Sequence, residues 1–261
     1  MKIMITGTDR RSCVIEETLK EELNCEIYRY DGTVYEDTSV IILPTPVTSD
    51  GVNLNFTEAK DKSIKRLLSG ADKNTLIIGA GFNHSRVYDL CSRDDFSIEN
   101  AIPTAEGAVA IAIENTQTML FDSNILISGF GRVSRILLDR LRSFRANLTV
   151  AARKSGNLAE IRALGMNAIN ISDIKAHIKN FDIVFNTIPF CIFDSETLSD
   201  ASPDTLFIEL ASRQAGFDKS ALNNLPYFVN APGLPGKVAP ISAGKIMAKT
   251  IITLLSENNL L

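Results

Sequence analysis

The sequence contains few of the residues that build metal sites and disulfide frameworks. Its 261 residues include four cysteines, two histidines and no tryptophan. The cysteines are Cys13, Cys25, Cys91 and Cys191, and no pair has the spacing of metal ligands. We therefore expect no metal site, and four reduced, partly buried thiols in a reducing compartment.

Long apolar runs and an excess of basic residues are also absent. No stretch approaches the roughly 20 apolar residues that cross a bilayer, and the first residues, MKIMITGTDRR, lack the apolar core of a signal peptide. The net charge is −4, and no basic stripe typical of a nucleic-acid binder is present. We expect a cytoplasmic protein with neither a membrane nor a nucleic acid as partner.

Short apolar runs alternate with helical stretches along the whole chain. The expected strands are 2–6, 25–30, 40–43, 75–78, 124–128, 148–152, 182–186, 205–210 and 227–229. The expected helices are 11–23, 57–68, 105–115, 132–144, 158–164 and 242–255. Such alternation predicts an α/β protein with parallel strands and crossover helices.

The alternation is interrupted once, at residues 84–103, which are polar and show no clear period. We place a domain boundary here. One α/β domain then covers residues 1–102, and a second covers residues 103–240. The final segment, 241–261, is expected to pack back on the first domain.

A glycine-rich turn follows the first expected strand of the second domain. The strand at 124–128 runs into Gly129-Phe130-Gly131, and a helix begins at Arg132-Val133. The first glycine permits the tight turn, and the second lets the backbone approach a diphosphate. The helix start then offers free N–H groups and a favourable dipole to the anion. The pattern predicts a Rossmann dinucleotide site, with Ser134 at the position where a small residue is needed.

The residues after the next strand indicate which dinucleotide is bound. An NAD site usually has Asp or Glu here for the ribose 2′-hydroxyl, whereas this chain has Arg153, Lys154 and Ser155. Two cations suit a 2′-phosphate, so the sequence favours NADP over NAD. The alternative is an exposed basic loop.

Three further strand ends carry small or polar residues. They are Asn186-Thr187-Ile188-Pro189, then Glu209-Leu210-Ala211-Ser212, and then the segment 231–237. Ligands of open parallel sheets bind beyond the carboxyl ends of the strands. We therefore expect Asn186, Thr187, Ile188, Pro189, Glu209, Ala211 and Ser212 to line the cofactor site.

Together these segments resemble the family formed by the A subunits of dipicolinate synthase from spore-forming bacteria. The resemblance rests on PTAEGAVAIAIENT at 103–116, GFGR at 129–132, VAAR at 150–153, NTIP at 186–189, ELAS at 209–212, APGLPGKVAP at 231–240, SAGKI at 242–246, GTDRR at 7–11 and ILPTPVTSDG at 42–51. Three departures are visible: the first domain is shorter, Glu209 stands where the family usually has Asp, and Ser134 occupies the third position of the glycine motif.

The resemblance implies a fold like that of formate/glycerate dehydrogenases, with a C-terminal Rossmann NADP domain and a smaller flavodoxin-like substrate domain. It implies NADP-dependent oxidation of a dihydrodipicolinate to pyridine-2,6-dicarboxylate in the mother cell during sporulation. It also implies a flavoprotein-like B subunit as partner. The sequence leaves the oligomeric state open, with a homo-oligomer among the options.

A substrate with two carboxylates calls for cations and N–H donors. Lys237 is the first catalytic candidate, as a carboxylate ligand or a proton carrier, and the alternative is a solvated loop lysine. Glu106 and Thr104 open a helix, where Glu106 either takes the proton or complements the helix dipole. The expected substrate ligands are Thr45, Arg10, Ser212, Arg213 and Lys237, with Arg11 beside Arg10.

Two other functions compete with this one. A 2-hydroxy acid dehydrogenase of the same architecture would use a His near the end of the cofactor domain, and residues 205–250 contain none. The second alternative belongs to a different class: a cofactor-binding regulatory or scaffold subunit without turnover of its own. It stays open because the resemblance implies a two-subunit enzyme. An assay of the chain with and without its partner separates these possibilities.

Overall fold

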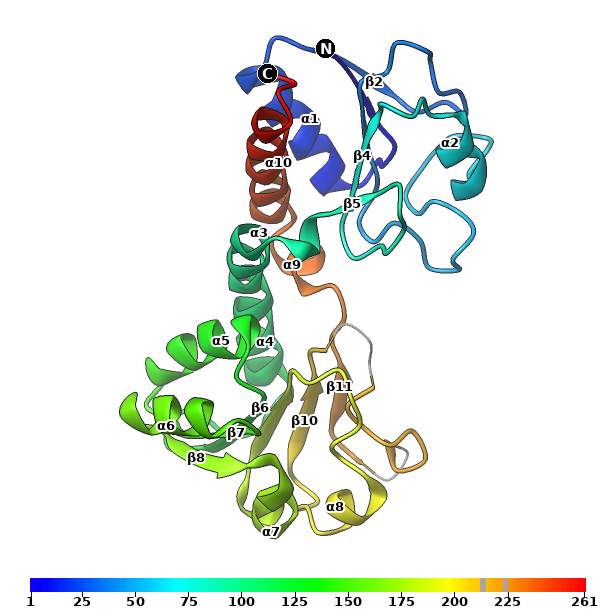
Figure 1. Ribbon diagram of the computed structural model, residues 1–261. Coiled ribbons are helices and arrows are strands. Elements are labelled where there is room, and N and C mark those ends of the chain that lie inside the picture. Colours follow the sequence, from blue (N-terminus) through cyan, green and yellow to red (C-terminus); the bar gives the residue numbers. More distant parts are fainter. Residues whose placement is uncertain (212–214, 223–224) are drawn as a thin grey trace. The chain divides into compact units, whose positions relative to one another are not determined.

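The structure, a computed structural model, describes residues 1–211, 215–222 and 225–261. It divides the chain into two compact units (Figure 1). Unit 1 combines Met1–Asn100 with Pro235–Leu261, and unit 2 is Ala101–Leu234. Unit 1 is therefore discontinuous in the sequence, and unit 2 is inserted into it.

Unit 1 is built on a parallel sheet with the strand order β2-β1-β3-β4-β5. Its strands are β1 (Lys2–Ile5), β2 (Glu26–Arg29), β3 (Val40–Ile42), β4 (Leu76–Gly79) and β5 (Tyr88–Asp89). This is the doubly wound order of flavodoxin-like folds. The strand order reverses between β1 and β3, so the loops after these two strands lie at the edge where such sheets usually bind ligands.

Helices cover both faces of this sheet. Successive strand residues point to opposite sides, so Ile3 and Ile5 contribute to one buried cluster and Met4 to the other. The first cluster is covered by α1 (Arg10–Glu22), α3 (Asp94–Glu99) and α10 (Pro240–Glu257), and the second by α2 (Ile64–Gly70).

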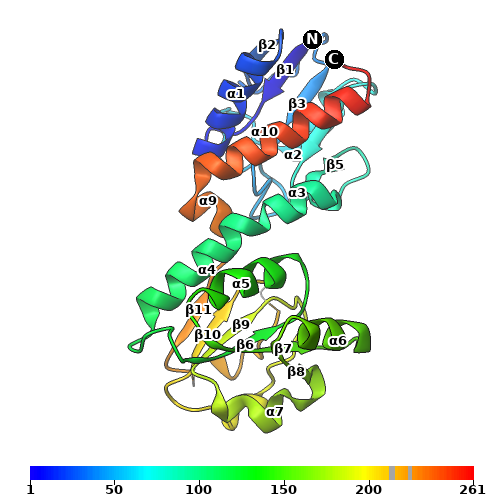
Figure 2. The same ribbon diagram turned by 90° about the vertical axis from the view of Figure 1, so that its left-hand side faces the viewer.

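Helix α10 lies along α1, as both views show (Figures 1 and 2). The contact depends on Gly244, because a Cβ there would lie 2.8 Å from the Cβ of Val14. The final helix therefore forms part of the core of unit 1.

Arg93 ties α3 to the end of α10. Its guanidinium lies 2.8 Å from the Asp95 carboxylate and 2.5 Å from that of Glu257. The hydrogen bond from Arg93 lowers the pKa of Asp95 to about 2. A lowered carboxyl pKa adds stability that is present above the ordinary pKa of about 4 and is lost as the pH falls toward 2.

We therefore expect Asp95→Asn to destabilise the protein in full above pH 4 and progressively less as the pH falls from 4 to 2. The loss in the free energy of unfolding should be below about 1 kcal/mol at pH 7, because the pair is partly exposed, and it should vanish near pH 2. Urea unfolding of both proteins across this range measures the difference. Glu58→Gln, which removes an exposed carboxylate elsewhere in unit 1, should show no such pH dependence.

Unit 2 contains a six-stranded parallel sheet with the order β11-β10-β9-β6-β7-β8. The strands are β6 (Asn124–Ser128), β7 (Asn147–Ala152), β8 (Asn167–Asn170), β9 (Ile183–Asn186), β10 (Leu206–Glu209) and β11 (Phe228–Asn230). This is the Rossmann order, with the reversal between β6 and β9. The expected two-domain α/β class is confirmed.

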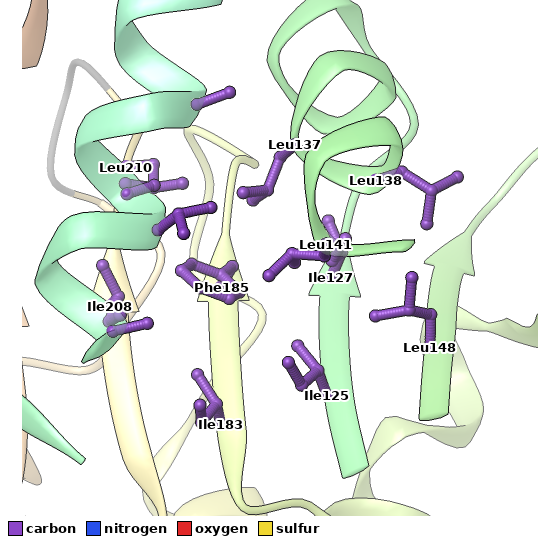
Figure 3. Close-up of a cluster of buried hydrophobic side chains, with 14 of the residues drawn as sticks. Ile125, Ile127, Leu137, Leu138, Leu141, Leu148, Ile183, Phe185, Ile208 and Leu210 are labelled. Carbon is purple, nitrogen blue, oxygen red and sulfur yellow. The ribbon is translucent and has the colours of Figure 1, made fainter. Parts of the chain in front are cut away.

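The core of unit 2 lies mainly between the sheet and the helices α4 (Ala101–Asn115), α5 (Arg132–Arg142) and α6 (Ser155–Ala163). Figure 3 shows Leu137, Leu138 and Leu141 of α5 projecting toward the strands. The opposite face is covered by α7 (Ile174–His177), α8 (Ser195–Ser199) and a group of phenylalanines that includes Phe193 and Phe217.

Several element predictions were wrong at the local level. The helix expected at 57–68 begins only at Ile64, because Ser63 caps it through a hydrogen bond to the N–H of Arg66. The stretch 84–103 is not irregular: it holds β5, a 3-10 turn (Leu90–Ser92), α3 and the start of α4. The segment after β11 forms a short helix, α9 (Leu234–Val238), instead of a loop.

Within the described residues, no helix has the length and apolar character that crossing a bilayer requires.

Candidate functional site

The turn between β6 and α5 accepts only glycine at its first position. Gly129 has φ of +95°, a region that side-chain-bearing residues rarely adopt. A Cβ there would lie 2.5 Å from the hydroxyl oxygen of Thr187 and 3.1 Å from the side chain of Ile188. The residue after β6 is therefore fixed both by its backbone conformation and by the loop after β9.

The second glycine of the turn leaves open space. Gly131 is the N-cap of α5 and makes no side-chain cap, and a Cβ built on it meets no atom within 4 Å. The first N–H groups of a helix have no partner within the helix and, with the helix dipole, attract anions. The start of α5 therefore offers an uncrowded anion-binding position, and Arg132 and Val133 form its first turn.

Phe130 anchors the turn between the two glycines. Its side chain is buried, and the guanidinium carbon of Arg135 lies 4.0 Å from the ring centroid. Arg135 in turn pairs with Glu160 of α6. The side chain of Phe130 thus packs against the protein and holds the turn in place.

A pair of hydroxyls locks the turn to the loop after β9. The Thr187 hydroxyl donates to the carbonyl of Ser128 at 2.7 Å and lies 2.8 Å from the hydroxyl of Ser134. Ser134 is buried in the first turn of α5. The third position of the glycine motif therefore carries a hydroxyl with a structural partner, which explains how Ser is accommodated there.

A buried polar row crosses the carboxyl ends of β6, β9 and β10. Ser128, Asn186 and Glu209 are the last residues of these strands and stand opposite one another in register. The Ser128 hydroxyl donates to Asn186 Oδ1 at 2.6 Å, and Asn186 Nδ2 donates to both carboxylate oxygens of Glu209 at 2.9 and 3.0 Å. Asn186 also accepts a bond from the N–H of Ile188. Through Asn186, the hydrogen bonds of this row hold the Thr187–Pro189 loop against the end of the sheet.

Glu209 is 2% exposed, and among the described residues it accepts hydrogen bonds only from N–H groups. Besides Asn186, the donors are the backbone N–H of Ala211 at 2.8 Å and of Gly216 at 3.0 Å. Burial raises the pKa of Glu209, whereas these hydrogen bonds act in the opposite direction. A protonated carboxyl would point its O–H at an N–H donor, so the hydrogen-bond pattern fits the carboxylate. A side chain at Gly216 would meet Asn186 and Glu209 at once.

The basic segment after β7 faces solvent. Arg153, Lys154 and Ser155 are exposed, and neither cation forms an ion pair with any residue the structure describes. Lys154 is the N-cap of α6 and makes no side-chain cap. Two cations and a second helix start therefore lie together at the carboxyl end of the strand next to β6.

The two catalytic candidates on α4 are placed differently from each other. Glu106 is exposed, and its carboxylate lies 3.8 Å from Nε of Arg140 on α5. Thr104 lies two residues earlier on the same helix and is half-buried. Both belong to unit 2.

In unit 1, the neighbouring residues Arg10 and Arg11 point in different directions. Arg10 points along its own helix toward Glu17, 3.8 Å away. Arg11 is 12% exposed, pairs with Asp9 at 2.9 Å and donates to the carbonyl of Thr45. Helix α1 begins at Arg10 and turns that side chain outward, so Arg11 rather than Arg10 contacts Thr45.

Lys237 lies exposed on α9, within the part of the chain assigned to unit 1. The preceding residue, Gly236, packs on Arg11: a Cβ there would lie 2.7 Å from the guanidinium carbon. Arg11 thus links α1, the loop after β3 and α9. Ser212 and Arg213, also expected at the site, lie outside the described residues.

The comparisons with known proteins agree with the resemblance seen in the sequence. No family model matches the chain. The chain is 31% identical to the A subunit of dipicolinate synthase from Bacillus subtilis (strain 168), over 98% of this chain and 96% of that protein. The crystal structure of the A subunit of dipicolinate synthase from Bacillus halodurans matches with a TM-score of 0.89 at 26% identity, covering 97% of each chain.

A more distant match concerns the fold alone. NAD-dependent formate dehydrogenase from Staphylococcus aureus, solved in complex with NAD, gives a TM-score of 0.59 at 14% identity. The alignment covers 98% of this chain and 95% of that one. The expected likeness to the formate dehydrogenase fold is confirmed.

Proposed function

The chain belongs to the family of dipicolinate synthase A subunits, and from that premise we propose that it oxidises a dihydrodipicolinate-type substrate to pyridine-2,6-dicarboxylate with NADP. The Gly129–Gly131 turn carries the proposal. Its strand, its left-handed glycine and the open space at Gly131 fit a dinucleotide diphosphate. The dehydrogenase-type fold supports an oxidoreductase.

The described residues divide between the two halves of a dinucleotide. The backbone N–H groups at the start of α5 would hold the diphosphate. Arg153, Lys154 and Ser155 would hold the 2′-phosphate on the adenosine side, at β7. The Thr187–Pro189 loop and the end of β10 would then face the nicotinamide half, because the two halves lie on opposite sides of the point where the strand order reverses.

The reaction removes a hydride from a ring carbon and a proton from the ring, and it leaves an aromatic pyridine. When bound, the dinucleotide accepts the hydride. Because aromatisation supplies the driving force, the protein chiefly has to hold the two rings in a productive arrangement. Lys237 is our proposed carboxylate ligand or proton carrier, and Thr104 and Glu106 are proposed to orient or accept the proton.

Arg10, Thr45, Ser212, Arg213 and Lys237 are the proposed substrate ligands, and Arg11 is proposed to position two of them. Its pairing with Asp9 and the Thr45 carbonyl makes it a residue that orders the loop after β3. Lys237 follows Gly236, which packs on the same guanidinium. The role proposed for Arg11 is therefore to position Thr45 and the helix that carries Lys237.

The test begins with binding. We expect NADP⁺ to bind at least about tenfold more tightly than NAD⁺, because two cations meet its extra phosphate. Isothermal titration calorimetry of the purified chain measures both dissociation constants. Equal affinities would remove the basis for NADP, and absence of binding by either would remove the proposed function.

The second step separates a catalytic from a non-catalytic subunit. Dihydrodipicolinate, generated in situ, is supplied with NADP⁺ to the chain alone and to the chain with a flavoprotein-like B subunit. We expect pyridine dicarboxylate absorbance and NADPH to rise together with the chain alone. Product that forms only after the B subunit is added would show that this chain binds the cofactor without turning over by itself.

A further inference from the structure

We infer that the buried carboxylate of Glu209 makes the site bind the oxidised dinucleotide in preference to the reduced one. The inference rests on the proposed function. In it, Glu209 acts through its negative charge, which attracts a positively charged ring. The nicotinamide ring of NADP⁺ carries a positive charge, and the ring of NADPH does not. A negative charge held near this ring distinguishes the two forms of an otherwise almost identical ligand.

The position of Glu209 follows from the strand order. It ends β10, two strands from β6, in register with Asn186 and Ser128. The basic segment at Arg153 and Lys154 lies on the other side of β6. A dinucleotide whose 2′-phosphate binds there places its nicotinamide half over the ends of β9 and β10.

The charge of Glu209 has no partner of opposite sign among the residues the structure describes. Its carboxylate accepts from Asn186 and from the backbone N–H groups of Ala211 and Gly216, which are all neutral. Neutral donors satisfy the oxygens but do not cancel the charge, and burying an uncompensated charge is costly. A cationic ligand bound nearby would lower that cost.

Burial also increases the range of the charge. At 2% exposure Glu209 is shielded from solvent, so its field is screened less than that of a surface carboxylate. A cationic ring arriving at this edge compensates the charge, and the attraction disappears when the ring accepts a hydride. The same carboxylate therefore favours binding of the oxidant and release of the reduced product.

The experiment measures the ratio of the dissociation constants of NADP⁺ and NADPH. Dissociation constants of NADP⁺ and NADPH are determined for the unaltered chain, Glu209→Gln, Glu209→Asp and Asp204→Asn. Asp204 is exposed and precedes the amino end of the same strand, so its variant removes an equal charge at the far edge. We expect Glu209→Gln to shift the ratio toward NADPH by on the order of tenfold. Glu209→Asp and Asp204→Asn should keep it within about twofold.

The outcomes separate three cases. A ratio unchanged in Glu209→Gln, with both forms bound more weakly, means that Glu209 only positions the loop, and it overturns the inference. If the unaltered chain binds neither form, the proposed function itself fails. If it binds both forms and only the ratio does not respond, the proposed function stands without the inference.

A second measurement avoids the variant, because the new amide in Glu209→Gln faces N–H donors and can prevent folding. The ratio is then followed in the unaltered chain from pH 8 to pH 5.5. Among the described residues the hydrogen-bond partners of Glu209 are not titratable. Burial raises the pKa of Glu209, and the pH is lowered further where needed until carbon-13 NMR shows the carboxyl taking up its proton. Protonation must reduce the preference for NADP⁺, and a ratio that stays constant through this transition contradicts the inference.

Discussion

Replacing Gly129 by alanine is expected to abolish dinucleotide binding and to lower the free energy of unfolding by about 3 kcal/mol. The φ of +95° is strained for alanine, and the new methyl group would lie 2.5 Å from the Thr187 hydroxyl. Thr187 cannot simply rotate away, because its hydroxyl is bonded to Ser128 and close to Ser134. Denaturant unfolding and NADP⁺ titration measure the two effects.

Gly131→Ala is the matched control for Gly129→Ala. No atom lies within 4 Å of the added Cβ, and φ of −95° is ordinary for alanine. We expect unchanged stability and a dissociation constant for NADP⁺ raised more than about tenfold, since the methyl group fills the space in front of the helix start. If Gly131→Ala binds NADP⁺ as tightly as the unaltered chain, the diphosphate does not lie where we propose.

The double variant Arg153→Asp with Lys154→Ala should weaken NADP⁺ binding on the order of 100-fold and NAD⁺ binding far less. It removes two cations and introduces a carboxylate that repels the 2′-phosphate. Both side chains are exposed and form no ion pairs among the described residues, so the fold should be unaffected. Parallel titrations with the two dinucleotides measure the change.

The control for this variant moves the same charges elsewhere in unit 2. Arg162→Asp with Lys179→Ala alters two exposed cations, one on α6 and one in the turn after α7. We expect both dissociation constants to stay within about twofold. An equal loss of NAD⁺ and NADP⁺ binding in the Arg153 and Lys154 variant would refute the 2′-phosphate assignment.

The sequence predicts the parts of the fold in which local pattern and burial agree. The strand at 124–128, its glycine turn and the amphipathic helix after it were correct because apolar spacing and turn chemistry coincide there. Strand β8 was missed, because Asn167 and Asn170 flank only two apolar residues at the sheet edge. Helix α2 was extended too far, because composition alone does not reveal that Ser63 is the cap.

The residues of the candidate site also fall into those that the sequence predicts and those that it does not. Motif spacing identifies the glycine turn and the basic segment, since both are contiguous in the chain. The Ser128–Asn186–Glu209 row depends on register between strands that are far apart in sequence, and one residue of slip would turn it to the other face. Arg10 and Arg11 differ only in the phase of one helix, which the sequence does not fix.

The insertion of unit 2 within unit 1 sets an order for synthesis on the ribosome. Residues 101–234 are synthesised as one uninterrupted stretch, so every strand of unit 2 is made before residue 235. The core of unit 1 stays incomplete until α10 has left the exit tunnel, because Ile15 and Leu19 of α1 share a buried cluster with α10. A helix translated after the inserted unit therefore completes the hydrophobic interior of the unit that was begun before it.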